Sequence, residues 1–213
     1  MPTEGIPVSL GRGGCQGDNI KGVFKENDLT VYKNPYAKSK IEQENLLKNY
    51  IKNLNIVILR CFNPIGMSKE YLQNSLIKND TIIPTILNCI KEDKPFNIYG
   101  NNFNTKDGTT IRDYVDINDM VECIYKSYQN IQTKNNTYNI WNVGSGKGTS
   151  VKELVEMLEQ ITKKSIKINC LEARKGESLT LIADMKKTKK DLYISSLIPL
   201  SETLKNVVKL FLK

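Results

Sequence analysis

The sequence contains no histidine among its 213 residues. This absence excludes Ser-His and Cys-His nucleophile pairs, and it removes a ligand on which the common zinc sites depend. Proton transfer in an enzyme of this composition must then fall to tyrosine, lysine, aspartate or glutamate. We therefore expect no metal site, and we expect any acid-base chemistry to use one of those four residue types.

Cysteine pairs and long hydrophobic runs are also missing. The five cysteines are odd in number, widely spaced and never arranged as CxxC, which predicts reduced, mostly buried thiols. No run of about 18 apolar residues occurs, and the first residues lack the basic-then-apolar order of a signal peptide. These absences predict a cytoplasmic protein without a membrane segment.

Acidic residues are fewer than basic ones, with 23 Asp and Glu against 31 Lys and Arg, giving a formal net charge of +8. Such a charge raises the question of a nucleic-acid partner. The lysines, however, are scattered along every expected helix instead of being gathered in one arm. We therefore expect no nucleic-acid binding from this charge.

The chain does contain alternating helix-like and strand-like segments. Residues 1–30 are rich in Gly, Asp and Asn and predict an irregular segment, and residues 63–66 predict a loop because they contain Pro and Gly. Hydrophobic periodicity predicts strands at 55–60, 96–99, 108–115, 137–143 and 165–171, and helices at 36–52, 84–92, 118–128, 151–161, 184–192 and from 201 onward. This alternation predicts an α/β fold with parallel strand pairs.

One candidate for acid-base chemistry is the pair Tyr36 and Lys40. The two residues lie four apart in an expected helix, so their side chains share one face. An ammonium beside a phenol favours phenolate, which makes the tyrosine a usable acid or base near neutrality. With ten tyrosines and many lysines in the chain, the spacing also arises by chance, and alone it favours a solvated helix face.

Longer strings give this pair a context. NPYAKSK (34–40), LRCFNPIG (59–66) and YGNNFNTKDGTTIRDYVD (99–116) follow one another along the chain. They resemble the NPYxKSK, LRxFNPxG and FGxxYxTxDGTxxRDYIHV stretches of UDP-glucose (UDP-galactose) 4-epimerases, which are extended short-chain dehydrogenases/reductases. YNIWNVGSGKG (138–148) and ARKGE (173–177) continue the resemblance, which runs from about residue 24 to the last residue.

The resemblance implies an NAD-dependent isomerase that interconverts UDP-glucose and UDP-galactose through a 4-keto sugar. It implies that Tyr36, a catalytic and cofactor-binding residue, takes the proton of the sugar 4-hydroxyl while hydride leaves C4 for the nicotinamide. Lys40 would hold the nicotinamide ribose and tune Tyr36. The substrate-binding residues would be Phe62, Asn63, Asn97, Tyr99, Arg112, Arg174 and Glu177, with both arginines on the diphosphate and Tyr99 beside the uracil.

The resemblance also implies the fold and what is missing from it. The expected fold is the C-terminal part of a Rossmann-like parallel sheet, interleaved over residues 31–213 with a small α/β substrate-binding lobe. The family's glycine-rich loop and adenosine-binding acid are absent, and Gly11 stands where a Ser or Thr would assist the tyrosine. We therefore expect an incomplete chain, inactive alone, with an unpaired apolar edge on strand 55–61, and a homodimer in the complete enzyme.

Other functions stay open at this point. A dehydratase or decarboxylase of nucleotide sugars would share the Tyr-Lys pair, and a noncatalytic remnant would bind UDP-sugar or a partner chain. A basic nucleic-acid module would leave the ordered strings unexplained. Thr81 replaces an asparagine and Glu177 an aspartate of the family pattern. Leu181 occupies the position where residue size is associated in the family with admitting N-acetylated sugars, so the choice between glucose and N-acetylglucosamine also stays open.

Overall fold

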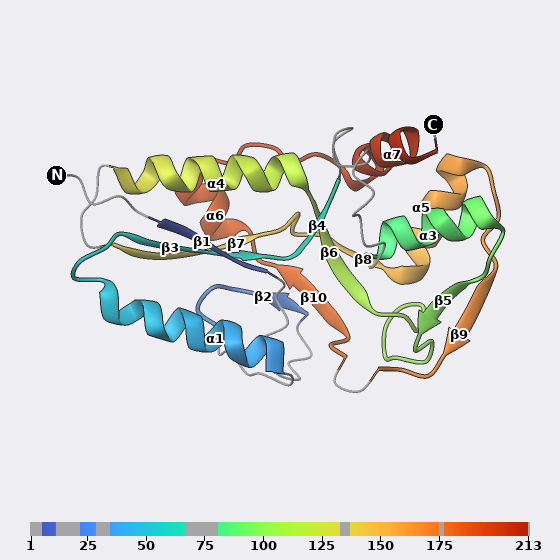
Figure 1. Ribbon diagram of the computed structural model, residues 1–213, viewed down its shortest axis with the longest axis horizontal. Helices are drawn as coiled ribbons and strands as arrows, with labels where there is room; N and C mark the ends of the chain where they lie inside the picture. The colour runs from blue at the N-terminus through green and yellow to red at the C-terminus, as the bar shows by residue number, and fades with distance from the viewer. Residues whose placement is uncertain are drawn as a thin grey trace.

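The computed structural model describes residues 22–28, 35–66, 81–132, 137–174 and 177–212, together with the backbone of residues 6–11. Figure 1 shows an elongated molecule with a layered α/β part at one end and a smaller lobe, rich in helices, at the other. The helices and strands expected between residues 36 and 211 are present, and most of their ends lie within a few residues of the expected ones. The expected α/β fold is confirmed.

The layered part is built on a parallel sheet of three strands. Its order is β1 (Ile6–Gly11), β3 (Ile56–Cys61) and β7 (Tyr138–Val143). Helix α1 (Pro35–Leu47) covers one face, and α4 (Ile117–Gln132) and α6 (Lys186–Leu192) cover the other. Because both faces are covered, β3 is a continuous β-branched and aliphatic run that is buried almost throughout.

The prediction of an irregular segment over residues 1–30 is wrong for two strands, β1 and β2 (Val23–Phe24). Strand β1 pairs with β3 in parallel register from Ile6 opposite Ile56 to Gly11 opposite Cys61. Main-chain pairing with a buried neighbour overrides the weak strand propensity of the sequence IPVSLG. The expected unpaired edge on β3 is therefore also wrong, because β1 and β7 flank this strand.

A second sheet follows where the chain leaves β3. Strands β2, β10 (Thr180–Ala183), β6 (Ile111–Asp116) and β4 (Asn63–Ile65) are parallel in this order, and β8 (Gly148–Ser150) pairs antiparallel with β6. The loop predicted at 63–66 is thus a short strand over its first three residues. Among the described strands β4 is an edge, so Pro64 can sit in it without breaking a ladder on its free side.

The lobe packs α3 (Ile82–Glu92), α5 (Val151–Thr162) and α7 (Leu200–Phe211) around a common apolar core. Two parallel strands, β5 (Phe96–Tyr99) and β9 (Ile168–Leu171), close one side of it. The expected capping box at the start of α5 is confirmed, with reciprocal bonds between Ser150 and Glu153. A short 3₁₀ turn, η1 (Lys48–Tyr50), continues α1 in the layered part.

Three smaller expectations can be compared with the structure. Helix α4 begins at Ile117, and the Asp116 carboxylate accepts the Asn118 backbone N–H at 2.8 Å, so Asn118 is not its cap. Of the described cysteines, Cys61 and Cys123 are buried and Cys170 is exposed, all as free thiols. No helix in the described part of the chain is both long and apolar enough to cross a membrane.

The buried carboxylate of Asp113 joins the second sheet to the turn after β7. Its Oδ1 accepts the Ser145 N–H at 2.7 Å and the Ser145 hydroxyl at 2.6 Å. Its Oδ2 accepts the N–H groups of Gly146 and Ala183, both at 3.0 Å. Burial raises the pKa of Asp113, and these four hydrogen bonds oppose that rise. The side chain therefore fixes β6, β10 and residues 144–146 relative to one another.

Replacing Asp113 by Ala should lower the free energy of unfolding by about 3 to 4 kcal/mol, because three backbone N–H groups lose their acceptor in a buried site. Urea unfolding followed by circular dichroism measures the change. Asp28→Ala is the control, since Asp28 accepts one exposed backbone bond from Lys25. It should cost about 1 kcal/mol or less. Equal losses in both variants would contradict the role given to Asp113.

Candidate functional site

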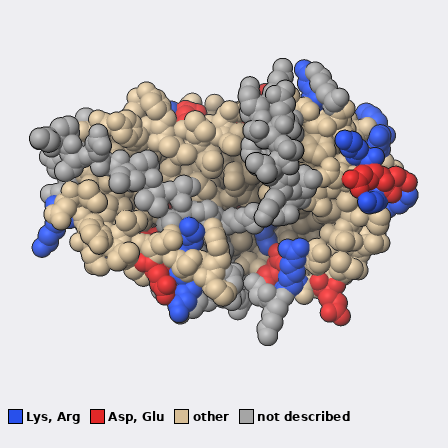
Figure 2. Space-filling model, in the orientation of Figure 1, with Lys and Arg blue, Asp and Glu red and all other residues tan. Residues whose placement is uncertain are grey.

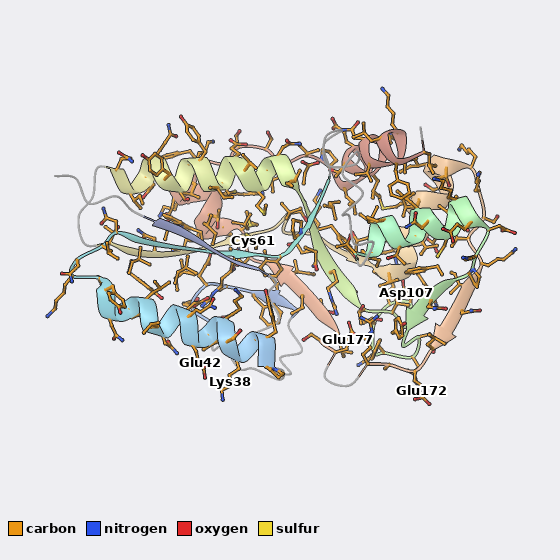
Figure 3. All side chains as sticks on the ribbon, in the orientation of Figure 1. Lys38, Glu42, Cys61, Asp107, Glu172 and Glu177 are labelled. Carbon is orange, nitrogen blue, oxygen red and sulfur yellow. The ribbon has the colours of Figure 1, made fainter. Side chains whose placement is uncertain are left out.

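A cavity of about 680 Å³ lies where the layered part meets the lobe. Its walls come from the first turn of α1, the chain leaving β3, the start of α3, strands β5 and β6, and the segment after β9. In Figure 3, Cys61 lies toward the sheet and Glu177 toward the lobe, and both line this cavity. The site therefore lies beyond the carboxyl end of a central parallel strand, the usual ligand position in open α/β sheets.

The structure brings nearly all predicted site residues into this cavity. Lys40 is the single predicted residue that does not line it. The predicted residues that do are Tyr36, Phe62, Asn63, Asn97, Tyr99, Arg112, Arg174 and Glu177. They come from five segments that are far apart in the sequence, so their convergence depends on the fold.

Tyr36 occupies the second position of α1, at the border between the cavity and solvent. Its side chain is 47% exposed, while the neighbouring Ala37 is buried. The Lys40 ammonium lies 5.7 Å from the centroid of the Tyr36 ring and donates to the Gln43 amide oxygen at 3.2 Å. The shared helix face expected for Tyr36 and Lys40 is present, with the cation beside the aromatic ring.

Phe62 and Asn63 fix the chain as it passes from one sheet to the next. The Phe62 N–H donates to the Val143 carbonyl at 2.9 Å, and the Asn63 side-chain amide donates to the Asp113 carbonyl at 3.1 Å. Phe62 is buried and packs with Leu181 and neighbouring residues. These bonds leave the Asn63 side-chain oxygen as a potential acceptor at the cavity wall.

Arg112 is held by the wall of the cavity itself. Its guanidinium donates to the Glu177 carboxylate at 2.9 Å and to the Ile111 carbonyl at 2.9 Å. Burial lowers the pKa of Arg112, and the nearby Glu177 carboxylate opposes this shift. A guanidinium stays charged even so, hence the pair presents a largely buried, oriented cation and its counter-charge to the cavity.

Tyr99 and Arg174 form a stacked pair at the lobe side. The Arg174 guanidinium carbon lies 4.0 Å from the centroid of the Tyr99 ring, within the range of a cation-π contact. Tyr99 and Asn97 are both exposed and lie two residues apart on β5, so they share one face of the strand. The stack places a flat aromatic surface and a cation next to each other.

Several lining residues were not predicted from the sequence, among them Cys61, Thr110 and Tyr114. Tyr114 could have been found, because it lies two residues after Arg112 on a strand, and alternate strand residues share a face. Burial raises the pKa of Tyr114 to about 12, while the Arg112 cation lowers it. Tyr114 is therefore a neutral phenol at the cavity wall.

Comparison with known families shows the family of this chain. Residues 16–144, more than half of the chain, match the model of the NAD dependent epimerase/dehydratase family. The chain belongs to this family.

Relatives within the epimerase/dehydratase family act on different sugars. The chain is 32% identical over 202 residues to Putative UDP-arabinose 4-epimerase 2 of Arabidopsis thaliana, covering 90% of this chain and 48% of the relative. It is 32% identical over 163 residues to a UDP-glucose 4-epimerase of Rhizobium meliloti, covering 75% and 49%. The chain thus spans about half the length of these curated relatives.

A solved structure of the family also superposes on the chain. UDP-glucuronic acid 4-epimerase from Bacillus cereus, in complex with UDP-glucuronic acid and NAD, gives a TM-score of 0.81 at 27% identity. The match covers 96% of this chain and 60% of that one. The expected Rossmann-like architecture is confirmed by this likeness.

The described residues fit one end of the family's NAD. A phenol and an ammonium on one face of α1, next to the carboxyl end of β3, suit a nicotinamide and its ribose. The sequence GRGGCQG (11–17) is rich in glycine, as phosphate-binding loops are. Its first residue, Gly11, ends β1, and residues 12–17 lie outside the described residues. Among the described residues no glycine-rich turn joins a strand to a helix N-terminus, so the fit concerns the nicotinamide end alone.

Tyr114 makes stability depend on alkaline pH. Its folded pKa of about 12 exceeds the unfolded value of about 10, so the neutral phenol contributes stability that is complete below pH 10 and is lost as the pH rises toward 12. Two pKa units correspond to about 2 to 3 kcal/mol. Tyr114→Phe should therefore lose less free energy of unfolding above about pH 10 than the parent chain.

Urea unfolding at a series of pH values tests this expectation. The exposed Tyr128 on α4 provides the control variant, Tyr128→Phe, which should follow the parent chain at every pH. An identical pH profile for Tyr114→Phe and its parent would show that Tyr114 is not the buried phenol described.

Proposed function

We propose that this chain carries the substrate site and the proton-transfer residues of a UDP-glucose/UDP-galactose 4-epimerase. The observation that carries the proposal is one cavity lined by Tyr36, by Arg112 and Arg174, and by the Tyr99 ring. A nucleotide sugar offers an alcohol, a diphosphate and a flat base, which are the groups these side chains recognise. The choice of glucose and galactose rests on the DGTTIRDY string at 107–114.

The diphosphate would bind between the two arginines. Arg112 comes from the interior with its orientation fixed by Glu177, and Arg174 approaches from the exposed side. A planar guanidinium can donate two parallel bonds to phosphate oxygens, and low exposure strengthens such bonds. Tyr99, with Asn97 beside it, would lie next to the uracil once Arg174 turns from the ring to the diphosphate.

Tyr36 would exchange the proton of the sugar 4-hydroxyl. With the Lys40 ammonium beside its ring, Tyr36 would accept this proton and later return it to the 4-oxygen of the sugar. Bound NAD would supply the hydride acceptor and donor for the same carbon. Phe62 and Asn63 would hold the sugar at the carboxyl end of β3.

A noncatalytic UDP-sugar-binding protein is the second candidate. The observation in its favour is Gly11, which ends β1 opposite Cys61, at a position where the epimerases that the sequence resembles have Ser or Thr. Glycine has no hydroxyl to assist Tyr36. Homodimer formation and the absence of nucleic-acid binding stay predictions. On the face shown in Figure 2 the basic side chains are spread over the surface, often next to acidic ones.

Arg174→Ala and Arg112→Ala should each weaken UDP binding by about 1.5 to 3 kcal/mol, or roughly 10- to 100-fold in Kd, because each removes a charge-assisted bond to the diphosphate. Calorimetry with UDP measures the affinity. Lys189→Ala on α6 is the control, since this exposed lysine lies outside the cavity wall. Unchanged affinity in both arginine variants would move the diphosphate site elsewhere.

Tyr36→Phe should keep UDP affinity and lose epimerisation by about 100-fold or more, because only the phenolic proton carrier disappears. The assay uses the chain joined to the amino-terminal half of the R. meliloti relative, with NAD and UDP-galactose. Equal turnover of variant and parent would refute the role of Tyr36. The 213-residue chain is assayed beside it and should not turn over; sustained turnover would show that the residues of this chain alone can hold NAD.

A further inference from the structure

Helix α1 carries Tyr36 but has few apolar means of fixing its own rotation. Its hydrophobic residues form no stripe, and its buried residues are just Ala37 and Glu44. Apolar packing gathers at its carboxyl end, where Leu47 and Ile51 contact Ile56 and Ile58. The direction of the ligand-facing Tyr36 phenol therefore depends on the interactions that fix the rotation of the whole helix.

One polar interaction that opposes rotation of α1 is a fork between its carboxyl-terminal turn and the central strand. The Arg60 guanidinium on β3 donates from Nε to Glu44 Oε1 at 2.9 Å and from Nη2 to Glu44 Oε2 at 2.7 Å. The two side chains are 15% and 12% exposed. Two parallel bonds between planar groups fix an angle as well as a distance, and low exposure limits screening by water and salt.

The fork acts on the same face of the helix as the candidate catalytic pair. Tyr36, Lys40 and Glu44 follow one another at intervals of four residues, so they lie on one side of α1. Tyr36 and Glu44 are separated by about 12 Å along the axis. A rotation of α1 that broke the fork would therefore carry the Tyr36 phenol around the helix with it.

Arg60 also connects this helix to the rest of the site. Its Nη1 donates to the Glu26 carbonyl at 2.9 Å, and the Glu26 carboxylate accepts the Asn142 N–H at 2.9 Å. Strand β3 ends one residue after Arg60, and Phe62 and Asn63 follow in the cavity wall. The Arg60 guanidinium thus contacts α1 and the segment after β2 directly, and through Glu26 it is connected to β7.

We propose that Arg60 and Glu44 are positioning residues that set the rotation of α1 and thereby aim the Tyr36 phenol into the cavity. Neither side chain lines the cavity, so they act through Tyr36 and not on a ligand. The proposal rests on the proposed function of Tyr36 as the proton carrier. A fork that served folding alone would change stability without changing the surroundings of Tyr36.

The test compares two charge-neutralising variants of the same helix. Glu44→Gln weakens the fork, and Glu42→Gln removes an exposed partner of Lys38, 3.8 Å away. Figure 3 shows Lys38 and Glu42 on the outer side of α1, away from the sheet. Both chains are labelled with 3-fluorotyrosine, and the ¹⁹F line of Tyr36 is assigned as the one missing in Tyr36→Phe.

In Glu44→Gln the Tyr36 line should move by more than its width, and in Glu42→Gln it should stay in place. Affinity for UDP, measured by calorimetry, should be the same in both, because Arg112 and Arg174 are not on α1. Arg60→Lys, which keeps the charge and loses the fork, should move the Tyr36 line in the same way.

The proposal would be overturned if the Tyr36 line stayed in place in folded Glu44→Gln and Arg60→Lys. It would also be overturned if neither variant folded, because the pair would then serve stability alone. If the parent chain did not bind UDP, the proposed function would be refuted. The fluorine spectra would still show whether the fork sets the surroundings of Tyr36. The two failures are therefore distinguishable.

Discussion

The buried carboxylate of Asp113 is the interaction on which the arrangement of the site depends. It accepts four hydrogen bonds, three from the turn after β7 and one from β10. Among the described strands, β7 and β10 belong to different sheets, so Asp113 joins the two. Arg112 and Tyr114, its neighbours on β6, both line the cavity. A strand alternates its side chains, so fixing Asp113 toward the interior turns these two toward the ligand side. Gly144 leaves room for this carboxylate, since a Cβ there would lie 2.6 Å from Oδ2.

Two arginines, one in the cavity wall and one beside it, are each paired with a carboxylate. Arg112 has Glu177, and Arg60 has Glu44, each at low exposure and in hydrogen-bonding geometry. Losing one member of such a pair leaves an uncompensated charge in a place poor in water, which costs far more than the pair itself contributes. Arg112 is therefore held at a fixed position before any ligand arrives, and preorganisation of this kind lowers the reorganisation that binding requires.

Sequence reasoning was strongest where one local signal agreed with the fold. The capping box at Ser150, the β-branched run of β3 and the Tyr36-Lys40 spacing each depend on neighbours in the chain, and each is present. It failed for β1 and β4, whose Gly and Pro residues suggest irregular backbone. Pairing with β3 and β6 decides their conformation, and that information lies far away in the sequence. The Arg60-Glu44 fork was missed for the same reason, since packing of α1 on the sheet brings it into place. Tyr114 is different, because its place two residues after Arg112 on β6 was a local signal that was overlooked.

Segments that are far apart in the sequence together form the walls of the cavity. Tyr36 belongs to the layered part, Tyr99 and Arg174 to the lobe, and Arg112 to the sheet between them. Any molecule that fills the cavity therefore binds the folded arrangement and not the unfolded chain. Its binding free energy is added to the free energy of folding, and it grows with the logarithm of ligand concentration above Kd. The layered part and the lobe meet at this cavity. A bound ligand therefore couples the two parts more tightly and favours their unfolding as one cooperative unit.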